Sequence, residues 1–153
     1  MEGTFGILTI RSMEARDVPA VMSIQSACPE IAQWTVRDYA HVAEGDMAGW
    51  VAGEEELAGF IVARRVASDL EILNFAVRTA ARRRGIGAAL LRGARDWGLT
   101  FSAERVFLEV RISNLAAIRF YERGGFEVTG RRPRYYSEPI EDALVLTASL
   151  RPG

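Results

Sequence analysis

A stretch in the middle of the chain combines arginines, glycines and the start of a helix, the components of a phosphate-binding turn. Residues 82–84 are three arginines in a row, and Gly85 and Gly87 follow them directly. The first backbone N–H groups of a helix have no partner within it, and the helix dipole adds partial positive charge there. Glycines let a pyrophosphate approach that backbone closely, and arginines supply forked donors. The stretch therefore predicts a diphosphate site, with a tight turn on a solvated basic face as the alternative.

Two well-known nucleotide motifs do not explain this stretch. A P-loop needs Gly-x-x-x-x-Gly-Lys-Ser/Thr, which does not occur in the chain, and the dinucleotide fingerprint needs a glycine where Leu90 stands. The phosphate would belong to a different class of ligand.

The reactive side chains are few. Cys28 is the only cysteine and His41 the only histidine, so an internal disulfide cannot form and a zinc site is not expected. Catalysis by a Cys–His pair or a Ser–His–Asp triad would depend on His41 alone. We therefore expect no metal, and a reducing, cytoplasmic location.

The length, charge and hydropathy of the chain indicate one globular domain over residues 1–153. Of its 153 residues 49% are hydrophobic and 25% charged, which is enough to fill one core and argues against wholesale disorder. The net charge of −1 supplies no overall attraction to nucleic acid. No apolar run reaches the ~20 residues that a membrane helix needs, and residues 1–6 lack the layout of a signal peptide. We expect a monomer or weak dimer that binds neither nucleic acid nor membrane directly.

Patterns of apolar and turn residues predict a mixed α/β fold around a central sheet. Strands are expected at residues 7–12, 49–53, 57–66, 69–77, 105–111, 126–132 and 142–150. Helices are expected from Asp17 to Ala27, from Thr35 to near Gly45, from Ile86 to Phe101 and from Asn114 to Arg123. Strand 69–77 would lead through the arginine–glycine stretch into the longest helix.

These motifs resemble the GNAT superfamily of N-acetyltransferases, over nearly the whole chain. Residues 82–88, Arg-x-x-Gly-x-Gly-Ala, resemble its acetyl-CoA motif, and residues 73–77, Leu-Asn-Phe-Ala-Val, resemble the strand before it. Residues 108–126, which run from Leu-Glu-Val-Arg to Gly-Phe, are similar to the branch that acetylates the N-terminal alanine of a small-subunit ribosomal protein. Residues 131–143, with Arg-Arg, Tyr-Tyr and Glu-Asp-Ala, match the last hairpin of that branch.

The resemblance implies a GNAT fold, with a mixed sheet of six to seven strands, about four helices and a splay between the fourth and fifth strands. It implies acetyl-CoA as cosubstrate, no metal, Glu109 as general base and Tyr121 as general acid. The residues that would bind the cosubstrate are Phe75, Ala76, Val77, Arg82, Arg83, Arg84, Gly85, Ile86, Gly87, Ala88 and Asn114. The residues that would line the acceptor side are Trp34, Tyr135 and Tyr136.

The acidity of the acceptor amine decides how strong a base is needed. An N-terminal amine has a pKa of about 7.7–8.0, against about 10.4 for lysine, so roughly a tenth of it is neutral at pH 7. A modest base such as Glu109 then suffices for direct attack in a ternary complex, with backbone N–H groups of residues 75–77 for the oxyanion. The alternatives are an ion pair between Glu109 and an arginine such as Arg111, and a Tyr121 packed on Phe126 with its hydroxyl in water.

Three functions remain open. The first is acetylation of a protein N-terminus, with a ribosomal protein as partner. The second is acetylation of a small amine such as a polyamine or aminoglycoside, which would need a deep acidic pocket. The third is a non-catalytic acyl-CoA sensor that binds the coenzyme without turnover. Glu109 and the Tyr135–Tyr136 pair favour the first function over the second, and Glu109 with Tyr121 counts against the third.

Overall fold

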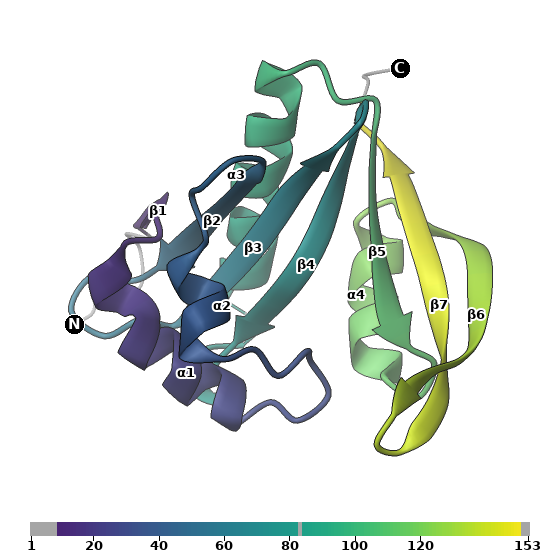
Figure 1. Cartoon of the computed structure of the whole chain (residues 1–153), viewed down its shortest axis with the longest axis horizontal. Coiled ribbons are helices and arrows are strands. Elements are labelled where there is room, and N and C mark those ends of the chain that lie inside the picture. Colours follow the sequence, from purple (N-terminus) through teal and green to yellow (C-terminus); the bar gives the residue numbers. More distant parts are fainter. Residues whose placement is uncertain (1–8, 83, 151–153) are drawn as a thin grey trace.

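The computed structural model describes residues 9–82 and 84–150, which form one seven-stranded sheet with helices on both faces (Figure 1). The strands are β1 (Ile10–Ser12), β2 (Met47–Ala52), β3 (Gly59–Val66), β4 (Asp69–Val77), β5 (Arg105–Arg111), β6 (Glu127–Ser137) and β7 (Ile140–Ser149). The helices are α1 (Val18–Ser26), α2 (Val36–Ala40), α3 (Ile86–Thr100) and α4 (Leu115–Arg123), with 3₁₀ turns at Ala15–Asp17 and Thr79–Ala81. The predicted mixed fold is confirmed.

The sheet has the order β1-β2-β3-β4-β5-β7-β6, and β4 and β5 are its one parallel pair within the described residues. This pair is hydrogen-bonded only between residues 69–71 and 105–107. Beyond these residues the two strands separate, as Figure 1 shows. The predicted splay is therefore confirmed, and it leaves the C-terminal half of β4 without a strand partner on one side.

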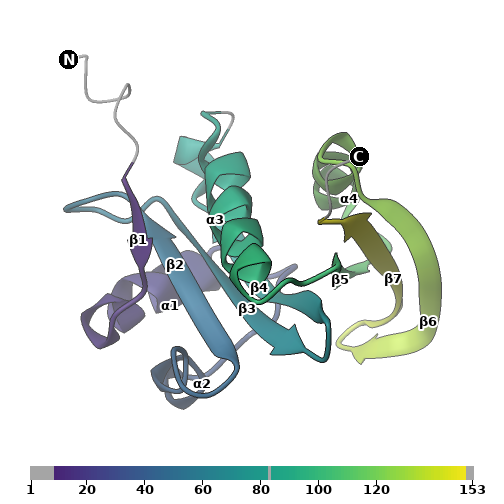
Figure 2. The ribbon, with the colours of Figure 1, turned by 90° about the horizontal axis from the view of Figure 1, so that it is seen from above.

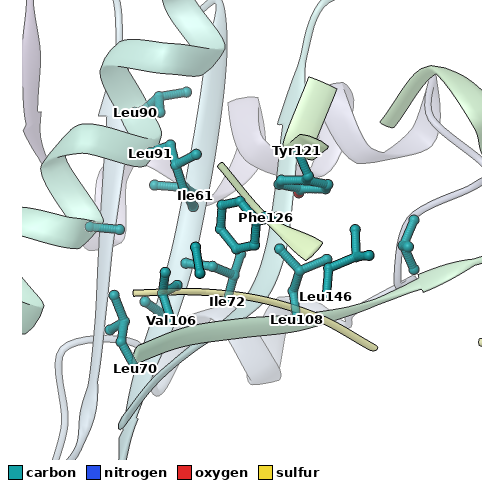
Figure 3. Packing of buried hydrophobic residues seen from close by; sticks show 14 of the residues in the cluster. Ile61, Leu70, Ile72, Leu90, Leu91, Val106, Leu108, Tyr121, Phe126 and Leu146 are labelled. Carbon is teal, nitrogen blue, oxygen red and sulfur yellow. The ribbon is translucent and has the colours of Figure 1, made fainter. Parts of the chain in front are cut away.

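Two apolar clusters hold the helices to the sheet. In Figure 2, α3 and α4 lie on one side of the sheet and α1 and α2 on the other. The cluster under α3 and α4 includes Leu90, Val106 and Leu146, which are fully buried (Figure 3). The cluster under α1 and α2 includes Ile24 and Phe60. Burial on both faces accounts for the apolar run from Phe60 to Ala63 in β3, whereas β4 and β5 alternate between buried and less buried residues.

Local residue choices fix the helix that follows the arginines. Gly85 occupies the N-cap position of α3 with a φ of +78°, a left-handed conformation that glycine adopts without cost. The buried stripe of the helix, spaced by three and four residues, consists of Ile86, Leu90, Leu91, Ala94 and Gly98. The sequence predicted this helix almost to the residue because the cap and the stripe agree.

Three details differ from the sequence predictions. Helix α2 ends at Ala40, not near Gly45, because Ala43 takes a φ of +79° that no α-helix contains. The Asp17 carboxylate stands at the start of α1 but binds Arg11 and the Glu14 N–H instead of capping the helix.

The last hairpin is also longer than predicted. Strand β6 continues to Ser137, past Pro133, because the register shifts between Arg132 and Tyr136 and Pro133 falls in that irregular segment. A single domain over residues 1–153 stays a prediction, since residues 1–8 and 151–153 lie outside the described part.

Candidate active site

Two clefts lie beside the point where β4 and β5 separate, and they share part of their walls. The turn cleft, of about 690 Å³, adjoins the glycine turn before α3. The hairpin cleft, of about 350 Å³, adjoins the β6–β7 hairpin. The six residues that line both clefts are Glu30, Ile31, Phe75, Asn114, Ala117 and Tyr121.

The turn cleft contains most of the residues predicted to bind the coenzyme. Those found in its lining are Phe75, Ala76, Val77, Arg82, Gly85, Ile86, Gly87, Ala88 and Asn114. Arg84 is exposed and is not part of the lining, and Arg83 lies outside the described residues. Segments from β4, α3 and α4 therefore meet at one cleft.

The two glycines of the turn, Gly85 and Gly87, have different surroundings. A Cβ on Gly85 would have no atom of the described protein within 4 Å, so it would project into open space of the turn cleft. A Cβ on Gly87 would lie 3.3 Å from the Phe120 ring and 3.6 Å from the Phe75 ring. Gly85 thus leaves the helix N-terminus accessible to a ligand, whereas Gly87 lets two aromatic rings pack.

Arg82 has a structural partner on each side of the turn. Its Nε donates to the Val77 carbonyl oxygen at 3.1 Å, and its Nη2 lies 3.8 Å from the Sγ of Cys28. The guanidinium therefore ties the end of β4 to the chain segment after α1, in the wall of the turn cleft.

The backbone at the end of β4 presents N–H groups toward the space that β5 has left. The Arg78 N–H donates to the Ala58 carbonyl, on the β3 side, at 2.7 Å. Because N–H directions alternate along a strand, those of Phe75 and Val77 point to the opposite side. The Phe75 N–H is accepted by the Asn74 Oδ1 at 3.2 Å. The end of β4 therefore directs backbone N–H groups toward the gap, and the Phe75 N–H among them already has the Asn74 side chain as acceptor.

Tyr121 stands on α4 between the two clefts. Its ring packs on Phe126 at a centroid distance of 5.3 Å and faces Phe75 at 6.2 Å, and the residue is only 7% exposed (Figure 3). Burial raises the pKa of its hydroxyl above the ordinary value. The packing on Phe126 is as in the alternative interpretation, but the side chain is buried at the junction of the clefts and is not placed in bulk water.

Glu109 projects from β5 into the hairpin cleft, where residues of β6 hold it. Its Oε1 accepts a hydrogen bond from the Tyr135 hydroxyl at 2.9 Å, and its Oε2 forms an ion pair with the Arg132 Nε. Within the described residues, that buried Oε2 accepts no hydrogen bond of good geometry despite the ion pair. The alternative that Glu109 forms an ion pair with an arginine is therefore confirmed, but its partner is Arg132 and not Arg111, which pairs with Glu141 at 3.1 Å.

The three aromatic residues predicted for the acceptor side line the hairpin cleft with Glu109, beside Phe75 and Tyr121. Tyr135 is 48% exposed, and Tyr136 lies beneath the Arg111 guanidinium, 4.2 Å from its ring centroid. Trp34 enters from the loop between α1 and α2 and packs on Tyr39. The structure therefore brings the predicted acceptor-side residues and both predicted catalytic residues to one cleft.

Sequence patterns did not reveal three further residues behind this wall. Gln25, Tyr39 and Asn74 are each at most 5% exposed and are linked by hydrogen bonds. A signal was present, because Gln25 and Asn74 are polar residues at positions where the helix and strand patterns call for apolar ones.

Two negative findings concern the described residues. In residues 9–82 and 84–150 no cluster of three or more His, Cys, Asp or Glu side chains could hold a metal ion. In the same ranges no helix is long and apolar enough to cross a membrane.

Comparisons with known proteins agree with this geometry. Residues 13–126 match the model of the acetyltransferase (GNAT) family. The [ribosomal protein bS18]-alanine N-acetyltransferase of Escherichia coli (strain K12) is 30% identical over 141 residues, 90% of this chain and 95% of that protein. The crystal structure of the ribosomal-protein-S18-alanine N-acetyltransferase from Escherichia coli superposes with a TM-score of 0.83 at 28% identity, covering 96% of each chain. That of Ard1 from Thermoplasma volcanium gives 0.82 at 29% identity, over 95% of this chain and 99% of that one.

A splayed sheet, a glycine turn at a helix N-terminus and a family match over most of the chain define one class of protein. The chain belongs to the acetyltransferase (GNAT) family. It is an acetyl-CoA-dependent N-acetyltransferase.

Proposed function

We propose that the enzyme acetylates the N-terminal α-amine of a protein, and that its acceptor is the N-terminal alanine of a small-subunit ribosomal protein. The observation that carries this proposal is the junction at Tyr121, where a cleft lined by Glu109 and aromatic side chains meets the cleft beside the glycine turn. A protein N-terminus that enters the hairpin cleft would do so with its amine leading, so the amine would be the group that reaches the junction. The Escherichia coli relative named for alanine of bS18 supports this choice of acceptor.

The residues of the turn cleft fit the coenzyme. When bound, acetyl-CoA supplies an acetyl group activated as a thioester. The exposed N-terminus of α3 at Gly85, with no side chain in the way, would hold its diphosphate. The strand end from Phe75 to Val77 and Asn114 would hold its arm, and Arg82, Arg83 and Arg84 would add positive charge.

Two side chains would move protons. Glu109 would accept a proton from the incoming amine, and Tyr135 with Arg132 would hold its carboxylate in the cleft. Tyr121 would donate a proton from its hydroxyl to the departing sulfur. This role needs a protonated hydroxyl at neutral pH, which the ordinary tyrosine pKa of about 10 already provides.

The charge of the hairpin cleft argues against a polyamine or aminoglycoside. Three carboxylates line the cleft, those of Glu30, Glu71 and Glu109, which would favour a polycation. However, Glu71 is paired with Arg64 at 2.6 Å and Glu109 with Arg132. Two of the three charges are thereby offset, and the cleft lacks the excess negative charge that such a substrate requires.

The proposal includes the setting of the reaction. We place the enzyme in the cytoplasm as a monomer or weak dimer, with the acceptor N-terminus as its partner and no direct contact with nucleic acid or membrane. A non-catalytic sensor would not need Glu109 and Tyr121 in one cleft.

The test is CoA release in the presence of short peptides that differ only in their first residue. Spermidine and a peptide with a blocked N-terminus and an internal lysine serve as the competing acceptors. We expect the alanine peptide to be used with the highest kcat/KM. Preferred turnover of spermidine would replace this proposal with the small-amine function, and coenzyme binding without any turnover would replace it with the sensor.

A further inference from the structure

The loop between α1 and α2, residues 27–35, forms one wall of the hairpin cleft without regular secondary structure. Its residues Ala32 and Trp34 line the cleft. A loop has few backbone hydrogen bonds of its own, so its position depends on side chains that reach it from elsewhere. Those side chains come from the interior of the protein.

Asn74 joins this loop to the strand end at the junction of the clefts. Its Nδ2 donates to the Ala32 carbonyl oxygen at 3.0 Å and to the Tyr39 hydroxyl oxygen at 2.9 Å. Its Oδ1 accepts from the Phe75 N–H at 3.2 Å. One buried amide therefore contacts the loop, the helix layer and the backbone donor that faces the gap in the sheet.

The chain of hydrogen bonds continues to Trp34. The Tyr39 hydroxyl donates to the Oε1 of Gln25, which also accepts the Trp34 N–H at 3.1 Å. The Nε2 of Gln25 donates to the Trp34 carbonyl oxygen at 2.8 Å. Both backbone polar groups of Trp34 are thus held by one buried side chain.

Burying an amide or a hydroxyl costs free energy unless each of its polar groups is hydrogen-bonded, so apolar side chains would fill this core at lower cost. Tyr39 is 2% exposed, Gln25 3% and Asn74 5%, and they lie within the apolar cluster under α1 and α2. Fully satisfied buried networks fix one geometry, whereas apolar contacts tolerate small shifts. The network therefore sets the position of the cleft wall more than it adds to the core.

We propose that Asn74, Tyr39 and Gln25 are positioning residues that fix the Ala32–Trp34 wall of the hairpin cleft relative to the Phe75 backbone, and so set how the acceptor amine is aligned. This inference rests on the proposed function, because it assigns the hairpin cleft to the acceptor. It predicts that damage at Tyr39 or Gln25, for which no hydrogen bond to the Phe75 backbone is seen in the described structure, weakens use of the acceptor and leaves use of the coenzyme nearly unchanged.

The sharpest variant is Tyr39→Phe, which removes the one oxygen atom that links Asn74 to Gln25 and keeps the ring contacts with Trp34 and Phe60. We expect the KM for the alanine peptide to rise about 5- to 10-fold, with the KM for acetyl-CoA changed less than about 2-fold. Hydrogen exchange of the amides in residues 28–35 should become about 10-fold faster in the free enzyme.

One control variant tests for a merely structural effect, and two more variants test the network at its other members. Asp17→Asn removes a buried charge at the other end of α1, where the carboxylate binds Arg11, and should change neither the peptide KM nor loop exchange. Asn74→Ala and Gln25→Leu should each raise the peptide KM, and the double variant should resemble the worse single one, because both break the same chain of bonds.

The outcomes separate the two proposals. If the wild-type enzyme acetylates no peptide, the proposed function fails, and loop exchange in Tyr39→Phe still tests the network. Unchanged loop exchange in Tyr39→Phe would overturn the inference. So would an equal rise in the two KM values, or an Asp17→Asn enzyme with the same kinetic defect. If Asn74→Ala does not fold, Tyr39→Phe decides.

Discussion

The turn cleft and the hairpin cleft are built in different ways. One wall of the turn cleft is a continuous segment that runs from the end of β4 through the glycine turn to the start of α3, and another wall comes from α4. The key features of the continuous segment are backbone N–H groups and a missing Cβ at Gly85. The hairpin cleft joins the 27–35 loop, β4, β5 and β6, and its key features are side chains that hold one another, such as Tyr135 on Glu109.

This difference indicates how the two sites can vary. A cleft made of backbone and glycine depends on conformation, which changes only by breaking the turn. A cleft made of side chains from distant segments can be altered one residue at a time while the sheet stays intact. Within one fold, the coenzyme side is therefore constrained and the acceptor side is free to acquire different specificities.

The largest effect is expected from Glu109→Gln, which acts on the hairpin cleft alone. The change keeps the shape of the side chain and removes the proton acceptor, so we expect kcat to fall about 10²- to 10⁴-fold with unchanged coenzyme affinity. Steady-state kinetics and calorimetry with CoA measure the two quantities. Glu71→Gln, which also breaks an arginine pair, should cost less than about 10-fold. Near-normal turnover of Glu109→Gln would remove Glu109 as the base.

A smaller effect, confined to the turn cleft, is expected from Gly85→Val. Gly85 has a left-handed φ of +78°, which disfavours a branched side chain. The valine side chain would also project into the cleft. We expect the Kd for CoA to rise at least about 10-fold. The matched control is Gly45→Val, at a glycine with a φ of +59° and open space around it, which lines neither cleft. Equal loss in both variants, or no loss at Gly85, would contradict a diphosphate site at the turn.

Tyr135→Phe tests whether the side chains of the hairpin cleft depend on one another. Loss of the hydrogen bond to the Glu109 Oε1 should lower kcat, because this bond holds the base in place. The expected decrease is only about 3- to 10-fold, because the bond lies at the surface. Tyr136→Phe removes a hydroxyl from the same cleft, one with no hydrogen bond to Glu109 in the described structure, and should have a smaller effect. If the two variants behave alike, Tyr135 does not position Glu109.

The smallest effect is on the pH dependence of stability, and it appears only in alkaline solution. Burial raises the pKa of Tyr136 to about 12 and that of Tyr39 in the same direction. The stabilisation from a raised pKa is complete below the unfolded value of about 10 and is lost as pH rises through the folded value. The urea midpoint should therefore fall above about pH 10, and less steeply in Tyr136→Phe. Trp97→Phe, which removes no titrating group, should keep the wild-type slope. A midpoint that is flat to pH 11 would contradict the prediction.

Sequence patterns predicted the wall of the turn cleft between β4 and α3 well, because the parts of that wall are local in the chain. The stripe of α3, the arginines and Gly85 lie within about five helical turns of chain, and periodicity and capping rules act over that range. The end of α2 was missed for a related reason. The left-handed Ala43 that ends it is a backbone conformation with no residue-type signal, since alanine normally favours a helix.

Local periodicity and residue chemistry were enough to predict the helices and strands, their order and the reactive side chains. Which charged side chains meet depends instead on how distant segments pack together. Arg132 of β6 pairs with Glu109 of β5 although β7 lies between these two strands in the sheet, and Arg111 pairs with Glu141 of β7. The same holds for Asn74 and Tyr39, which are 35 positions apart in the chain and become hydrogen-bonded only when α2 packs beside β4. Contacts between distant segments depend on how the sheet and helices pack, and that information is spread over the whole core.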